Sequence, residues 1–238
     1  MVAPYAGGMC GRFVNNAGNE ELGAVFDTTV IGDLLPVPSW HVHPTETMRV
    51  VLDSKKTQER RLEGAVWSLA RPRQPQLVSR PPLFNVRAET AAQKFGYAVR
   101  SNRAIIPAAG YWEWRGESGR KTPFYIHPAE GLLAFAGLYS WWVDPTADSD
   151  DPARFHLTAA ILTMDAAPHL AEIHDRNPVV LPPEFWADWL DPRQEGDQGL
   201  VDAAVASATP VADALEFHEV RPFSTKDDGP GLIEPVGG

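Results

Sequence analysis

Two long apolar runs, residues 132–143 and 155–164, most constrain how this chain can fold. Both runs are rich in aromatic and β-branched side chains, which favour strands over helices. The stretch between them, residues 144–152, is rich in aspartate and carries two prolines, so it predicts a surface loop. Together the runs predict two buried strands joined by an exposed loop, and therefore a core that is built on a β-sheet.

Shorter segments predict further strands and a few short helices. Residues 47–52 and 62–69 are β-rich and are separated by a charged stretch, which predicts a hairpin. A helix is expected to begin at Asn19, whose side chain would cap the first amides. Further strands are expected at 103–106, 110–114 and 123–127, and further helices at 88–99, 183–190 and 200–206. Because strands do not alternate with long helices, the pattern predicts a single-domain α+β fold on antiparallel sheet.

Composition is that of a globular protein, with 44% hydrophobic residues among 238. No run approaches the roughly 18 apolar residues of a membrane span, and no secretory signal is visible, so no membrane partner and a cytoplasmic location are expected. The net charge is −10, yet from Arg80 to Lys121 eight basic residues face three acidic ones, a net charge of +5. This segment predicts either a local positive face or an unevenly charged, solvated surface.

Cys10 is the only cysteine, which excludes an internal disulfide and a cysteine-based zinc site. A lone cysteine is more often a small buried hydrophobe than a nucleophile. Cys10 follows Met9, however, and removal of an initiator methionine there would leave a free α-amine beside the thiol. The amine, with a pKa of about 8, can condense with an aldehyde, and the thiol, at about 8.5, can then close a thiazolidine. Cys10 is therefore the candidate nucleophile.

Two further segments carry candidate site residues. Asn85 could hold the amine or a substrate oxygen, or instead cap the following helix, and Arg87 could bind a phosphate through its planar fork. Glu113 lies between aromatic residues of a predicted strand, on the same face as Tyr111. If that face is buried, Glu113 becomes a usable proton donor near neutral pH; otherwise it faces water.

The third segment centres on His174, which is followed by Asp175 and Arg176 just before a proline. Most lone histidines are structural or merely exposed, but here Asp175 could orient the imidazole or pair with Arg176. His41 and His43 form a His-x-His pair, and no other cluster completes a ligand set around them. We therefore expect no metal and no cofactor.

Taken together, these segments resemble the SOS-response-associated peptidase (SRAP) family of abasic-site-processing, DNA-protein-crosslinking proteins. The matching pieces occur in family order: Met-Cys-Gly-Arg-Phe at 9–13, Asn-Val-Arg-Ala-Glu-Thr at 85–90, Ile-Pro-Ala-Ala-Gly-Tyr-Trp-Glu-Trp at 106–114, and Ile-His-Asp-Arg-Asn-Pro-Val-Val-Leu at 173–181. The ending Leu-Ile-Glu-Pro-Val at 232–236 is also similar. The resemblance implies a single α+β domain whose antiparallel sheets form a barrel-like core, with short peripheral helices and the cysteine at the bottom of a DNA-binding cleft.

The resemblance also implies roles for individual residues. The catalytic set is Cys10, Asn85, Glu113 and His174, and the DNA contacts are Arg12, Trp67, Arg71, Arg87 and Arg176. A core role for Trp67 is an equally open interpretation. The chain departs from the family where Trp40-His41-Val42-His43-Pro44 stands for Tyr-Asn-Val-x-Pro, so that His41 replaces an asparagine.

The implied function is covalent capture of abasic sites in single-stranded DNA, through a Schiff base and then a thiazolidine. Self-removal of the residues before Cys10 and strand cleavage by β-elimination are implied as well. Residues 1–8 are then an extension absent from the mature protein, and residues 9–238 form the catalytic domain, expected to be a monomer. Two alternatives stay open: a Cys10/His174 peptidase that acts on its own leader or on other substrates, and a non-covalent single-stranded-DNA-binding module.

Overall fold

The core of the computed structural model, which describes residues 11–117 and 121–237, is a closed barrel of five strands. These are β4 (Thr47–Asp53), β5 (Arg60–Trp67), β7 (Arg103–Ala108), β10 (Leu133–Val143) and β11 (Phe155–Asp165). The neighbours β5–β4–β7–β10–β11 pair antiparallel, and a parallel pairing of Thr158 with Val66 and Ala159 with Trp67 closes the ring. The expected barrel-like core is confirmed, with one parallel joint among its antiparallel pairs.

The two apolar runs form the longest hairpin of the barrel, as predicted. Strands β10 and β11 pair from Gly137 opposite Ile161 to Val143 opposite Phe155. The loop between them ends in a short 3-10 turn, η2 (Pro152–Arg154). The hairpin expected at residues 47–52 and 62–69 is also present, as β4 and β5.

A second sheet packs beside the barrel in the order β13 (Glu216–Glu219), β9 (Thr122–His127), β8 (Gly110–Arg115), β1 (Phe13–Asn15) and β3 (Ser39–Val42). Arg49 of the barrel ties the two sheets together. Its fully buried guanidinium donates to Asn15 Oδ1 at 2.7 Å and to Ala17 O at 2.5 Å. Burial lowers the pKa of Arg49 to about 10, which leaves it charged at neutral pH. These hydrogen bonds hold in place the segment that directly follows the N-terminal motif of residues 9–13.

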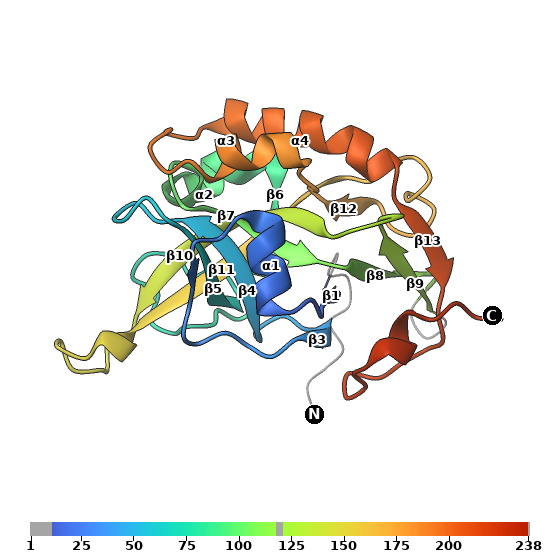
Figure 1. Cartoon of the computed structure of the whole chain (residues 1–238), viewed down its shortest axis with the longest axis horizontal. Helices are drawn as coiled ribbons and strands as arrows, with labels where there is room; N and C mark the ends of the chain where they lie inside the picture. Colours follow the sequence, from blue (N-terminus) through green and yellow to red (C-terminus); the bar gives the residue numbers. More distant parts are fainter. Residues whose placement is uncertain (1–10, 118–120, 238) are drawn as a thin grey trace.

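The helices lie outside the barrel, with α2, α3 and α4 along one side (Figure 1). Three expected helices exist with changed bounds: 88–99 opens as the turn η1 (Ala88–Thr90) before α2 (Ala91–Val99), 183–190 divides into η3 (Pro183–Phe185) and α3 (Trp186–Leu190), and 200–206 extends to α4 (Gln198–Asp213). None of the helices among the described residues is long and apolar enough to cross a membrane.

The predicted cap of the first helix is wrong. Helix α1 (Asn19–Phe26) begins at Asn19, but Gly18 is its N-cap and no side chain caps it. The Asn19 side chain instead accepts a hydrogen bond from Arg49, at 3.1 Å. Several short elements also escaped prediction: β1, β2 (Val30–Ile31), β3, β6 (Asn85–Arg87), β12 (Arg176–Pro178), β13 and η4 (Pro230–Ile233).

Candidate active site

The N-terminal motif enters the fold beside strand β8. Phe13 pairs with Tyr111, and the Trp112 amide donates to Arg12 O at 3.1 Å. Gly11 lies in van der Waals reach of the Phe84 ring and of Pro44, since a Cβ built on it would be 3.9 and 4.0 Å from their nearest atoms. Cys10 itself lies outside the described residues. Gly11, the residue after Cys10, therefore lies between β8, the segment before β6 and the turn after β3.

Glu113 is buried on β8, with 3% of its surface exposed. It stands opposite Phe124 of β9, and strand alternation puts it on the face of Tyr111. Tyr111 packs into the main core, with its ring 5.9 Å from Phe135, whereas Trp112 belongs to a separate apolar cluster on the other face. The inward-facing alternative for Glu113 is thus the one found in the structure.

Asn85 and Arg87 lie on β6, which runs parallel to β11 with Asn85 opposite Ile161 and Arg87 opposite Thr163. Asn85 is half-buried and Arg87 is exposed. Asn85 does not cap the following helix, because η1 begins three residues later and its N-cap is Arg87. Strand alternation points both side chains to the same side of β6, where an exposed guanidinium follows a partly buried amide.

His174 is half-buried in the segment before β12. Its Nδ1 lies 3.2 Å from the Arg176 amide and 3.0 Å from Asp175 Oδ1. Burial lowers the pKa of His174, with Asp175 opposing this and Lys121 adding to it. With its proton on Nε2 the neutral ring accepts the Arg176 N–H at Nδ1, whereas a proton on Nδ1 points to the Asp175 carboxylate. An ion pair of Arg115 with Glu172, at 3.8 Å, brings this segment to the end of β8, two residues beyond Glu113.

The Arg176 side chain is buried and makes its contacts inside the protein. Only 7% of it is exposed, and its guanidinium bonds Glu89, Asp165 and the carbonyl of Thr163, the last at 2.8 Å. These bonds tie β12 to β11 and to η1, and they hold the segment that carries His174. The buried position argues against the expected DNA contact and for a structural role.

Trp67 and Arg71 differ sharply in accessibility. Trp67 is fully buried, donates from Nε1 to Phe84 O at 2.9 Å, and packs edge-on against Phe13 with ring centroids 4.9 Å apart. A buried indole cannot stack on a base, so its role is to support the segment before Asn85. Arg71 is exposed, with its guanidinium 5.4 Å from the Phe95 ring centroid on α2.

His41 and His43 lie near Arg12; the sequence suggested them as a His-x-His pair and His41 as the replacement for a family asparagine. His41 is buried, 4% exposed, and its ring centroid lies 4.1 Å from that of half-buried His43. Burial lowers the pKa of His43 to about 4, with His41 and Arg12 adding to the effect. Across the part of the chain that the structure describes, no three His, Cys, Asp or Glu side chains form a metal-ligand group.

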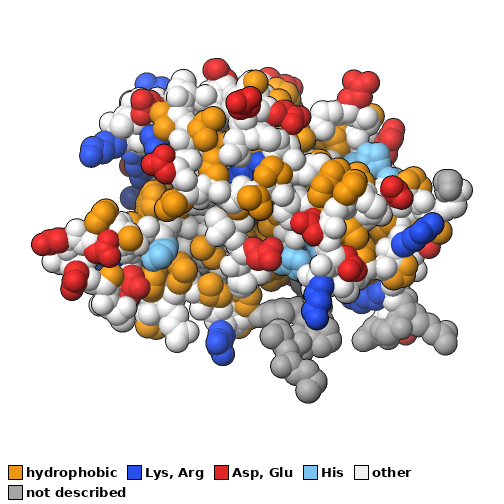
Figure 2. All heavy atoms as spheres, turned by 60° about the horizontal axis from the view of Figure 1, so that its bottom comes forward, with side chains coloured by type: hydrophobic (Ala, Val, Ile, Leu, Met, Phe, Trp, Pro, Cys, Tyr) orange, Lys and Arg blue, Asp and Glu red, His pale blue; other side chains and the backbone are white. Residues whose placement is uncertain are grey.

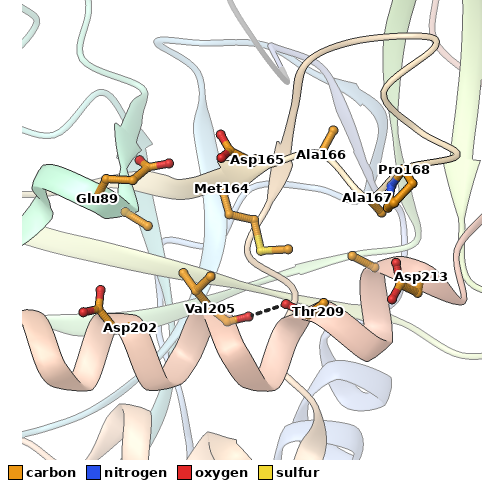
Figure 3. Close-up of a pocket in the computed structure, with 12 residues that line it drawn as sticks. Glu89, Met164, Asp165, Ala166, Ala167, Pro168, Asp202, Val205, Thr209 and Asp213 are labelled. Carbon is orange, nitrogen blue, oxygen red and sulfur yellow. Dashed lines mark hydrogen bonds between the residues drawn. The ribbon is translucent and has the colours of Figure 1, made fainter.

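A hollow of about 310 Å³ lies between η1, the end of β11 and α4. Figure 3 shows Asp202 and Asp213 of α4 on one side of it and Glu89 and Asp165 on the other. Four carboxylates would repel a phosphate, so the hollow does not extend a DNA site. On the face in Figure 2, basic side chains lie among acidic ones and form no continuous positive stripe across that face.

Known proteins share the sequence pattern and the fold of this chain. A sequence profile described as "SOS response associated peptidase (SRAP)" matches residues 9–223. Abasic site processing protein YedK of Escherichia coli K12 is 31% identical, covering 96% of this chain and 100% of its own, and protein YoqW of Bacillus subtilis is 30% identical, covering 95% and 99%. A crystal structure of a Bacteroides thetaiotaomicron protein shares the fold with a TM-score of 0.76 at 22% identity, covering 95% of this chain and 100% of that one. This chain belongs to the SOS response associated peptidase (SRAP) family.

Proposed function

We propose that this protein processes abasic sites in DNA by capturing them covalently through Cys10. The α-amine attacks the aldehyde of the ring-opened sugar, and loss of water gives a Schiff base. The thiol then adds across the C=N bond, its sulfur binding carbon and its proton passing to nitrogen, which closes a thiazolidine. Abasic-site processing is named for the relatives YedK and YoqW, and the proposal takes single-stranded DNA as the substrate.

The observation that carries the proposal is the buried carboxyl of Glu113 beside the N-terminal motif. Following the antiparallel register from Phe13 and Tyr111 by two residues brings Gly11 level with Glu113. Both ring opening and loss of water need a proton donor and acceptor, and a desolvated carboxyl near the nucleophile can serve as both. Glu113 is 3% exposed, so it meets the condition of desolvation.

The remaining polar residues take complementary roles. Asn85 orients the reacting groups from β6, and His174 assists proton transfer, including β-elimination at the captured sugar. Arg87, exposed and on the same side of β6 as Asn85, binds a phosphate, and Arg12 binds another beside Gly11. Arg71 remains a candidate backbone contact because its charge is exposed.

The chemistry requires a free amine on Cys10, so residues 1–9 must be absent from the working protein. Translation from Met9 followed by removal of methionine would achieve this, and so would self-cleavage before Cys10, which is the peptidase part of the proposal. Mass spectrometry of the purified protein distinguishes these routes. Permanently attached residues 1–8, with no other proteolysis, would exclude the self-cleavage route and the broader peptidase alternative.

The central test is incubation of a protein that starts at Met9 with an oligonucleotide carrying one abasic site. We expect a heat-stable crosslinked band that is absent in Cys10→Ala. Cys10→Ser is the matched control, because it keeps the amine and loses the thiol. It should give a band only when borohydride reduces the Schiff base. No heat-stable band from the Met9-start protein would refute covalent capture and favour the non-covalent binding module.

A further inference from the structure

The histidines at positions 41 and 43 form a packed pair next to the N-terminal motif, with ring centroids 4.1 Å apart. His41 Nδ1 donates to the Asp227 carbonyl at 2.8 Å, and the ring also packs 5.4 Å from Trp112 and 4.9 Å from Phe223, measured between centroids. Since Nδ1 carries the proton, Nε2 carries a lone pair. That atom is buried and has no hydrogen-bond partner among the described residues. A second proton on His41 would therefore be buried without an acceptor, and the ring stays neutral.

The His43 ring packs against this fixed ring at a tilt of 43° but keeps part of its surface in solvent. The next residue, Pro44, lies against Gly11, so His43 and Arg12 flank the point where the chain leads to Cys10. Both side chains are half-buried and can present N–H groups outward. A ligand at this spot would meet one permanent cation and one imidazole that can become a second.

The charges around His43 are unbalanced. Arg12, which directly precedes β1, and His41 from β3 both oppose a proton on the His43 ring. The nearby carboxylates act elsewhere: Glu46 accepts the His43 backbone amide at 2.8 Å and attracts Arg12, while Asp227 and Asp228 face His41. A ring held neutral by burial and by the neighbouring Arg12 charge is one that a bound anion would stabilise in its charged form.

We propose that Arg12 and His43 together bind a phosphodiester of the DNA strand next to the capture site, with buried His41 as the support that fixes the His43 ring. The identity of the anion as DNA rests on the proposed function. Binding of the phosphate and protonation of His43 are then linked, so acidification strengthens binding. Arg12 supplies charge at every pH, and His43 adds its charge only when the anion is present.

The size of the linkage follows from the pKa of about 4 in the free protein. If the phosphate raises this pKa by about two units, affinity rises about tenfold between about pH 7.5 and about pH 5.

The test is the anisotropy of a labelled oligo(dT), whose bases do not titrate in this range and which contains no aldehyde. We expect about tenfold tighter binding at about pH 5 than at about pH 7.5, and loss of this enhancement in His43→Ala. His43→Lys should bind tightly at both pH values, because its charge is permanent. His156→Ala, on β11 with its ring 5.4 Å from that of Trp142, is the matched control and should behave as wild type.

Enhancement that persists in His43→Ala, or that is missing in the wild-type protein, would overturn the proposal. Competition by inorganic phosphate at concentrations comparable to those of the oligonucleotide phosphates would show a site for the free ion in place of the strand, and would also overturn it. An NMR titration of the His43 ring gives a second readout, in which oligo(dT) should raise its pKa. Because no abasic site is present, these outcomes are independent of whether covalent capture occurs.

Discussion

Arg176 and Arg87 provide a direct test of whether burial separates structural from DNA-binding arginines. Both were expected from the sequence to contact DNA, but Arg176 is enclosed by Glu89, Asp165 and Thr163 while Arg87 is exposed. Replacing each by glutamine removes one positive charge and keeps a polar side chain. Arg176→Gln should therefore lose stability and keep its DNA binding. Arg87→Gln should keep its stability and bind DNA more weakly.

The cost of Arg176→Gln can be worked from its contacts. The side chains of Glu89 and Asp165 are 50% and 90% exposed, so each ion pair contributes at most about 1 kcal/mol. The bond to the Thr163 carbonyl is buried and contributes about 1 kcal/mol. The sum is about 2–3 kcal/mol, which corresponds to a fall of about 4–12 °C in the melting temperature of a chain of this length. Arg87→Gln should change stability by less than about 0.5 kcal/mol.

Thermal unfolding and oligo(dT) binding at several salt concentrations measure both effects. Arg87→Gln should weaken binding and reduce the salt slope by about 0.7, the value for one phosphate contact on a single strand. Arg176→Gln should leave the slope of the folded protein unchanged. The reasoning is refuted if Arg176→Gln melts like wild type and loses salt-dependent affinity, since that would make Arg176 a phosphate contact despite its burial.

Three further outcomes are expected. Glu113→Gln should slow crosslinking at least about tenfold, because a proton shuttle is lost, and leave oligo(dT) affinity unchanged; an unaltered crosslinking rate would contradict the role. Trp67→Phe should lower the free energy of unfolding in urea by about 2–3 kcal/mol, through the lost bond to Phe84 O and the space left behind, with no change in affinity per folded molecule; weaker binding at equal folding would return Trp67 to the DNA site. Burial holds the His43 pKa at about 4 in the folded protein, below its unfolded value of about 6.5, so the unfolded chain takes up more protons and stability is lost as pH falls between these values. Urea unfolding across this range should show a smaller loss in His43→Ala, and an equal loss would exclude His43 as its source.

Much of the fold could be predicted where a segment is long and has one dominant character. The hairpin of residues 132–143 and 155–164 followed from composition alone, as did the hairpin of β4 and β5. The three-residue strands β6 and β12 could not be predicted, because each is too short for a pattern and exists only through pairing with β11. Closure of the barrel by a parallel pair likewise depends on segments far apart in the chain.

The candidate site, too, could be predicted from the sequence only in part. The motifs named Asn85, Glu113 and His174, and the structure holds Gly11, next to Cys10, against Phe84 and beside β8. What the motifs could not give is exposure: Arg87 and Arg176 look alike in sequence, and only the carboxylates packed around the second distinguish them. The His-x-His pair was visible too, but its relation to Arg12 depends on the pairing of β1 with β3.

The pairing of β11 with β5 and with β6 joins segments that lie far apart in the chain, which has a consequence for how the proposed site would assemble. Local hairpins can form as soon as their strands are made, but Thr158 must find Val66 across a long stretch of chain, at the entropic cost of closing a large loop. Among the described residues β6 pairs with β11, so Asn85 takes its position only when β11 is in place. Under the proposed function, Cys10 would thus gain Asn85 as a neighbour late in folding. An incomplete chain that lacks β11 would carry the proposed nucleophile without an ordered Asn85.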